Sequence, residues 1–170
     1  GTNAVIDMND GTINYGTLAN VNWGNAHTVE YWAKFDGTQA DRDRHWAVGN
    51  DGSAPEMSYG FDHGSGANIN FYGDTVNVTH NGVINLQSGN TDWNHYLYQK
   101  HTDGNDNAYS FYFNGTRVVD GTNSIFSNIG NEKFRIGGRP DTSSGVEFPN
   151  FWITDFMIHQ KRKHTGSSFT

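Results

Sequence analysis

Short runs of alternating apolar and polar residues recur along the chain, separated by clusters of Gly, Asn and Asp. In residues 27–35, positions 29, 31, 33 and 35 are apolar, whereas positions 28, 30, 32 and 34 form a more polar face that includes Trp32. A period of two is typical of a β-strand with one buried face. The same pattern predicts further strands at residues 45–48, 57–61, 69–72, 93–100, 109–113, 116–119, 134–136 and 151–158.

The turn residues and the composition also indicate an all-β fold. Asn114 and Gly115 stand between two apolar runs, and this pair favours a type I′ hairpin turn because both residues tolerate a positive φ. The chain has 21 Gly, has Glu only at positions 30, 56, 132 and 147, and is 14% aromatic. The sequence shows no linker, internal repeat or helical period. We therefore expect one all-β domain that fills residues 1–170.

Four stretches carry a family resemblance: TVEYWAKF (28–35), WNHY (93–96), FYFNGTRV (111–118), and FRIGGRPD (134–141) with ITDFMI (153–158). In this order they resemble the laminin-G-like jelly roll of the concanavalin A-like lectin/glucanase superfamily. The resemblance implies a two-sheet antiparallel β-sandwich. The segment 163–170 is similar to the end of such domains in phage structural proteins, which suggests a virion.

The charge and the apolar content of the chain limit the classes of partner and the locations that we expect. The net charge is −7, and the one basic run, residues 161–164, is interpreted as a solvated strand end, so we expect no nucleic-acid partner. No stretch approaches the ~20 apolar residues of a membrane span, so we expect no membrane insertion. The absence of Cys fits a reducing interior and a surface protein equally well. Because the chain opens with Gly1, we interpret it as a segment of a larger extracellular or virion-surface protein.

Catalysis is not predicted. The superfamily that the chain resembles includes glycoside hydrolases with a Glu-x-Asp-x-x-Glu strand, in which two carboxylates act as nucleophile and acid. This sequence has no such motif, and it lacks the Gly-x-Ser-x-Gly elbow and the His-Glu-x-x-His zinc motif. A glycoside hydrolase remains an alternative, because carboxylates distant in sequence can pair in space.

A structural Ca²⁺ ion is implied by the resemblance. In relatives, the Asp of the last strand binds the ion together with an early turn, and the matching residues here are Asp155, Asp36 and Gly37. Ca²⁺ takes 6–8 oxygen ligands, including backbone carbonyls. The alternative is that Asp155 caps or pairs within the sheet.

Aromatic residues beside polar loops are the candidates for carbohydrate binding. Sugars stack their C–H faces on aromatic rings, while polar side chains bind the hydroxyls. The predicted ligand-binding residues are Trp46, Tyr59, His63, Tyr72, Arg139 and Asp141. The alternative is that most of these rings fill the core; Trp32 and Trp152 are interpreted as sheet residues, and His95 as a packed sheet residue.

Together these observations predict a non-catalytic adhesion or glycan-binding domain whose partner is a carbohydrate or a host-surface glycan. The alternative from another class is a purely structural virion module that contacts other virion proteins. A glycoside hydrolase is the third candidate.

Overall fold

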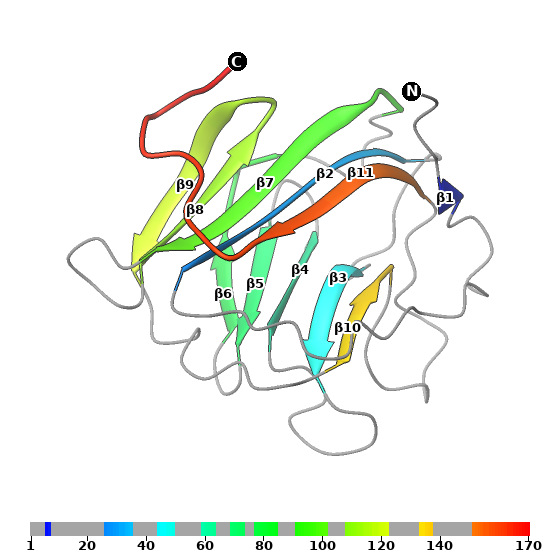
Figure 1. The fold of residues 1–170 in the computed structure, drawn as a ribbon, viewed down its shortest axis with the longest axis horizontal. Coiled ribbons are helices and arrows are strands. Elements are labelled where there is room, and N and C mark those ends of the chain that lie inside the picture. The colour runs from blue at the N-terminus through cyan, green and yellow to red at the C-terminus, as the bar shows by residue number, and fades with distance from the viewer. Residues whose placement is uncertain are drawn as a thin grey trace.

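The computed structural model describes residues 6–7, 26–35, 44–49, 59–63, 69–73, 77–84, 91–101, 108–122, 133–137 and 151–170. Within these ranges the secondary structure is β-strand without helix (Figure 1). The part of the chain that is described therefore offers no helix able to cross a membrane. The strands are β1 (Ile6–Asp7), β2 (His27–Phe35), β3 (Arg44–Gly49), β4 (Tyr59–His63), β5 (Ile69–Gly73), β6 (Asn77–His80), β7 (Asn94–His101), β8 (Ala108–Phe113), β9 (Thr116–Thr122), β10 (Lys133–Ile136) and β11 (Phe151–His159).

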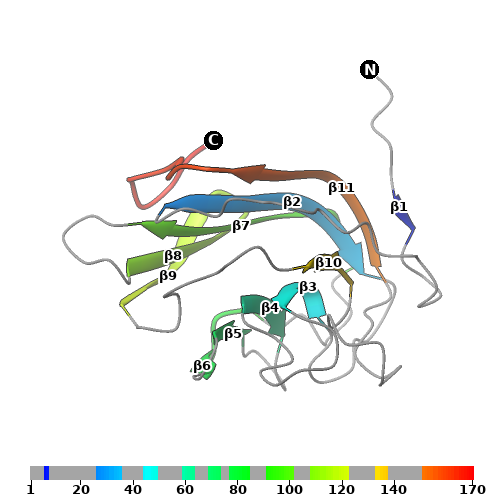
Figure 2. The same ribbon diagram turned by 60° about the horizontal axis from the view of Figure 1, so that its bottom comes forward.

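The strands form two antiparallel sheets that lie face to face. One sheet has six strands in the order β1-β11-β2-β7-β8-β9, and the other has five in the order β10-β3-β4-β5-β6. Figure 2 shows the sheets as two layers, with β2, β7, β8, β9 and β11 above β3, β4, β5 and β6. This is the two-sheet antiparallel sandwich that the family resemblance implies.

Strand register decides which side chains lie between the sheets. Val29 pairs with Tyr98, and Tyr31 pairs with Tyr96, so these alternate positions of β2 and β7 share the inner face. Phe111 of β8 lies opposite Tyr98 and continues that face. All five residues are almost completely buried, and Trp46 and Phe71 of the five-stranded sheet pack against the same cluster. Aromatic rings therefore make up much of the core.

The turn between β8 and β9 has the geometry that its sequence predicts. Asn114 has φ 48° and Gly115 has φ 78°, so both residues adopt the left-handed conformation of a type I′ turn. Phe113 and Thr116 close the hairpin as a register pair. This turn forms one side of the candidate site.

Strand β11 contains a β-bulge in its middle. Thr154 pairs with Trp32, but the next partner, Glu30, lies opposite Met157 instead of residue 156, so β11 carries one extra residue. Asp155 occupies the bulge with φ 52°, and it is exposed. The bulge places Asp155 outside the regular alternation of the strand.

Candidate functional site

The outer face of the six-stranded sheet, which points away from the five-stranded sheet, is covered in part by residues 161–170, here called the C-terminal tail (Figure 2). Gln99, a buried residue of β7, anchors the tail. Its Nε2 donates to the His164 carbonyl at 2.6 Å, and its Oε1 accepts from the backbone N–H groups of Lys163 and His164 at 3.3 and 3.2 Å. Thr28 Oγ1 donates to the Lys161 carbonyl at 2.8 Å. These polar outer-face positions are buried because the tail lies on them.

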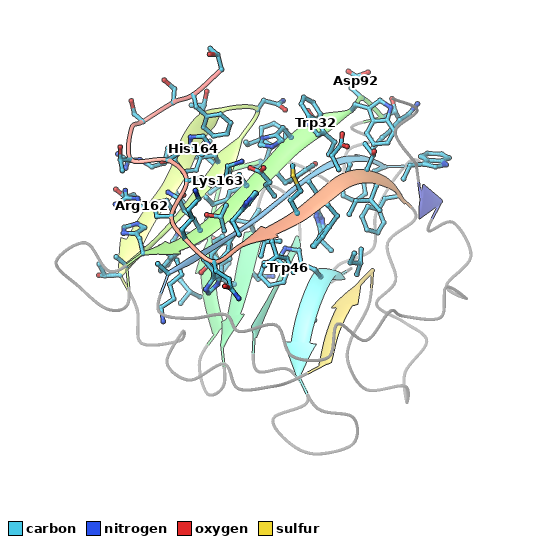
Figure 3. The ribbon with its side chains drawn as sticks, in the orientation of Figure 1. Trp32, Trp46, Asp92, Arg162, Lys163 and His164 are labelled. Atoms are coloured by element: carbon cyan, nitrogen blue, oxygen red, sulfur yellow. The ribbon has the colours of Figure 1, made fainter. Side chains whose placement is uncertain are left out.

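A buried carboxylate holds the basic part of the tail. The Glu30 side chain is 5% exposed, and its Oε1 lies 2.5 Å from Lys163 Nζ and 3.2 Å from His159 Nε2. Burial alone would raise the pKa of Glu30, but the hydrogen bonds and charges of Lys163 and His159 outweigh it and lower this pKa. Arg162 Nε donates to the His164 carbonyl at 2.8 Å. The basic run 161–164, predicted as a solvated strand end, is therefore docked on the sheet (Figure 3).

The far end of the tail packs on the β8–β9 hairpin. Tyr112 Oη donates to the Gly166 carbonyl at 2.7 Å, and the backbone N–H of Phe169 donates to the Gly115 carbonyl at 2.8 Å. The Phe169 ring stacks on the His164 ring, with centroids 3.8 Å apart and planes 9° apart. The tail thus reaches the positive-φ turn with its last aromatic residue.

Between the tail, the hairpin turn and β2 lies a cleft of about 400 Å³, here called the aromatic cleft. Two tryptophans on the protein surface line it, Trp32 at 41% exposure and Trp93 at 39%. The His95 ring lies 5.2 Å from the Trp32 ring and 5.6 Å from the Phe169 ring, centroid to centroid. The described residues of the lining are Trp32, Trp93, His95, Asn114, Gly115, Phe169 and Thr170.

Asn114 fixes the wall of the aromatic cleft between the two strands. Its Oδ1 accepts from the backbone N–H of His95 at 2.8 Å, and its Nδ2 donates to Asn94 Oδ1 at 2.8 Å. Its own backbone N–H donates to the His95 carbonyl at 2.9 Å. Asn94 Nδ2 in turn donates to the Asp92 carbonyl at 2.9 Å, next to Trp93. The network ties the segment that carries Trp93 to the hairpin turn, so the cleft has a preorganised wall.

His95 provides a polar group inside this aromatic surface. Burial lowers the pKa of His95 below its ordinary value of 6.5; the charge of Glu30 opposes this shift, and the charges of Lys163 and His164 add to it. The ring is therefore neutral at pH 7, with one nitrogen able to donate and the other able to accept a hydrogen bond. Rigid aromatic faces beside such groups form a surface suited to a sugar ring.

Four of the six predicted ligand-binding residues lie on strands of the five-stranded sheet. Trp46 is 1% exposed and packs in the core with its ring 5.8 Å from that of Tyr98, so it does not present a stacking surface to solvent and its predicted role is corrected (Figure 3). Tyr59, His63 and Tyr72 lie on β4 and β5 of the other sheet, and the orientation of their side chains is not described. Arg139 and Asp141 lie outside the described residues.

The predicted Ca²⁺ site is described only at Asp155. This residue is exposed at the β11 bulge, whereas Asp36 and Gly37 lie outside the described residues. Among the residues that the structure describes, no three His, Cys, Asp or Glu side chains gather as a metal-binding group. Asp155 alone does not decide whether the donor set fits Ca²⁺, so the ion stays a prediction.

The lining of the aromatic cleft was not predicted as a site. Trp32 was interpreted as a sheet residue, and His95 as a packed one. The alternation in residues 27–35 does put Trp32 on the more polar face with Glu30, which is a signal for an outward tryptophan. No local pattern shows that Phe169, far along the chain, closes the same cleft.

Neither a family model nor a curated protein matches the sequence. Among solved structures, a mutant of NanB sialidase from Streptococcus pneumoniae superposes with a TM-score of 0.63 and 14% identity, over 95% of this chain and 25% of that chain. Trypanosoma rangeli sialidase in complex with sialic acid gives a TM-score of 0.57 and 15% identity, over 84% and 22%. Native heptameric SAP-like pentraxin from Limulus polyphemus gives 0.59 and 14%, over 83% and 66%.

These likenesses show the fold, a two-sheet jelly-roll β-sandwich. The chain spans only 22–25% of the two sialidase chains. None of the three structures is described as a virion protein, so the similarity of residues 163–170 to phage proteins stays a prediction.

Proposed function

We propose that this chain is a non-catalytic carbohydrate-binding domain of an extracellular or virion-surface protein, and that it holds its glycan in the aromatic cleft. The observation that carries the proposal is the pair of exposed tryptophans, Trp32 and Trp93, in one cleft with His95. Isolated exposed apolar residues are common, but large aromatic rings that share a concave surface are typical of a binding site.

The size and chemistry of the aromatic cleft suit a short piece of glycan. Its volume of about 400 Å³ lies toward the lower end of the range for small-molecule sites, about 300–1,000 Å³. Each indole offers an apolar face to sugar C–H groups, and His95 and Asn114 lie where hydroxyl groups need partners.

The first experiment is a glycan array followed by calorimetric titration of the best ligand. We expect Trp32→Ala and Trp93→Ala each to weaken binding at least tenfold, which corresponds to about 1.4 kcal/mol, because each removes a stacking face. Neither side chain belongs to the buried core, so each variant should lower the melting temperature less than the loss of a core tryptophan such as Trp46 would.

Trp152→Ala is the matched control. Trp152 lies on β11 opposite Lys34, does not line the cleft, and its loss should leave binding intact. Equal losses in all three variants would argue against this site. Array binding to no glycan would favour the structural virion module, and turnover of a bound polysaccharide would overturn the non-catalytic assignment.

A further inference from the structure

We infer that the aromatic cleft selects neutral sugars and discriminates against sugars that carry a carboxylate. The inference rests on the proposed function and narrows it to a class of ligand. Its starting point is that the described lining contains two indoles, a phenyl ring, an imidazole, an amide and a hydroxyl, and no charged side chain. An acidic sugar that enters such a site loses hydration of its carboxylate without gaining a cation in return.

The cation of the tail that influences His95 is already paired. Lys163 lies close enough to influence His95, but its Nζ is bound to the buried carboxylate of Glu30 at 2.5 Å. Arg162 donates its Nε to the His164 carbonyl within the tail. Redirecting Lys163 toward a ligand would leave Glu30 as a buried charge without that partner, which is costly.

The imidazole of His95 does not replace a cation at neutral pH. Burial keeps the pKa of His95 below 6.5, so the ring enters the site as a neutral donor and acceptor. This arrangement suits hydroxyl groups, which both donate and accept hydrogen bonds.

A carboxylate beside the cleft adds repulsion. Asp92 is exposed and directly precedes Trp93, and it lies at the same end of the sheet as Trp32 in Figure 3. The net charge of the chain is −7, which also disfavours the approach of anions. The negative charges and the uncharged lining therefore both disfavour the binding of an acidic sugar.

The test compares pairs of ligands that differ only in charge. Neutral hexasaccharides of glucose, mannose and galactose would be titrated at pH 7.5 beside hexasaccharides of the same linkage in which C6 is a carboxylate. We expect the best neutral ligand to bind at least tenfold more tightly than its acidic counterpart, and Trp32→Ala to abolish this binding.

Asp92→Asn tests the contribution of the carboxylate beside the cleft. At low salt, this variant should have a severalfold smaller ratio of neutral-ligand affinity to acidic-ligand affinity than the wild type. Added salt should reduce the same ratio in the wild type, because it screens the charge of Asp92. Asp120→Asn is the control, because it removes one negative charge from β9, where Asp120 pairs with Arg117 at 3.2 Å. An equal preference in the two variants would overturn the role of Asp92.

The outcomes separate the inference from the function on which it rests. An acidic sugar that binds as tightly as its neutral partner, and depends on Trp32, would overturn the selectivity and leave the carbohydrate-binding function standing. If no saccharide of either class binds in a Trp32-dependent manner, both are overturned.

Discussion

Two stacked tyrosines in the core differ in what their hydroxyl groups contact. The rings of Tyr31 and Tyr96 lie 5.2 Å apart at an angle of 9°, and burial raises the pKa of both. The Tyr31 hydroxyl shares a hydrogen bond of 2.8 Å with His45 Nδ1. The Tyr96 hydroxyl is buried without a hydrogen-bond partner among the described residues. A buried polar group without a partner costs stability, so the two hydroxyls have opposite effects.

Tyr31→Phe and Tyr96→Phe form a matched pair of variants. We expect Tyr31→Phe to lower the free energy of unfolding by about 1–2 kcal/mol, because it removes one partner of a buried hydrogen bond. Tyr96→Phe should leave it unchanged or raise it by up to about 1 kcal/mol, since it removes a desolvated hydroxyl. Urea unfolding with an unchanged m value measures both. A loss in Tyr96→Phe as large as that in Tyr31→Phe would show that its hydroxyl has a partner.

The β8–β9 hairpin is the element that joins the fold to the candidate site. Its Gly115 has a positive φ, and a Cβ added there would collide with the backbone carbonyl oxygen of Phe169. Glycine is therefore required twice, by the turn and by the tail that packs on it. Gly82, in the turn after β6, also has a positive φ of 70°, but a Cβ there would meet nothing within 4 Å.

Comparing Gly115→Ala with Gly82→Ala isolates the contact with the tail. We expect Gly82→Ala to cost about 1–2 kcal/mol of stability, the cost of a left-handed alanine. Gly115→Ala should cost more and should also release the C-terminal tail, so that trypsin cleaves faster after Lys161, Arg162 or Lys163. Denaturant unfolding and timed digestion measure the two effects. Equal digestion rates in both variants would contradict the close packing of Phe169 on the turn.

The bulge of β11 is where the predicted Ca²⁺ ion can be tested. If Asp155 is a ligand, Ca²⁺ should raise the melting temperature and EDTA should lower it, because the ion binds only the folded state. Asp155→Asn should abolish this difference. Asn tolerates the positive φ of the bulge at least as well as Asp, so the variant changes the ligand more than the backbone. A melting curve insensitive to both Ca²⁺ and EDTA would exclude the site.

The alternating pattern predicted most elements because burial between two sheets imposes a period of two. The strand 27–35 and the type I′ turn at Asn114 agree with the structure. The pattern missed β1 and β6, which are short, and it assigned Asp62 and His63 to a loop although they end β4. Short strands contain too few residues for a period to emerge.

The candidate site was harder to predict than the fold, because it depends on contacts between distant segments. Trp46 and Trp32 both stand in strands with similar neighbours, yet one is 1% exposed and the other 41%. The two exposures differ because Trp46 lies on the face of its strand that points to the other sheet, whereas Trp32 lies on the face that points away from it. Likewise, Gln99 is polar on an outer face but buried, because residues 163 and 164 pair with it from 64 and 65 positions away.

At the scale of the whole molecule, buried ionisable groups make stability depend on pH. Burial lowers the pKa values of His80, His95, His101 and His164 below 6.5, and the pKa of Glu30 lies below 4.5 despite its burial. Each group therefore holds fewer protons in the folded chain than in the unfolded chain over part of the acidic range. Stability then falls as the pH falls.

We expect the free energy of unfolding to decrease below about pH 6.5 as the histidines of the unfolded chain take up protons, and to decrease further below about 4.5 because of Glu30. Urea unfolding at pH 7.5, 6, 5 and 4 measures the profile. Glu30→Gln should flatten the part below 4.5, whereas the decrease near 6 should remain, because the Glu30 charge raises the pKa of His95 and His164 and its loss lowers both pKa values further. A free energy that stays constant or rises from pH 7.5 to 5 would contradict these pKa directions.

The C-terminal tail has a mechanical consequence. One wall of the aromatic cleft is Phe169, which is held by a hydrogen bond to Gly115 and by its stack on His164. A pulling force applied at Thr170 would reach these contacts before any strand of the six-stranded sheet. Tension would detach Phe169 from the hairpin while both sheets stay folded. The affinity for a ligand should therefore fall at a lower force than the force that unfolds the domain.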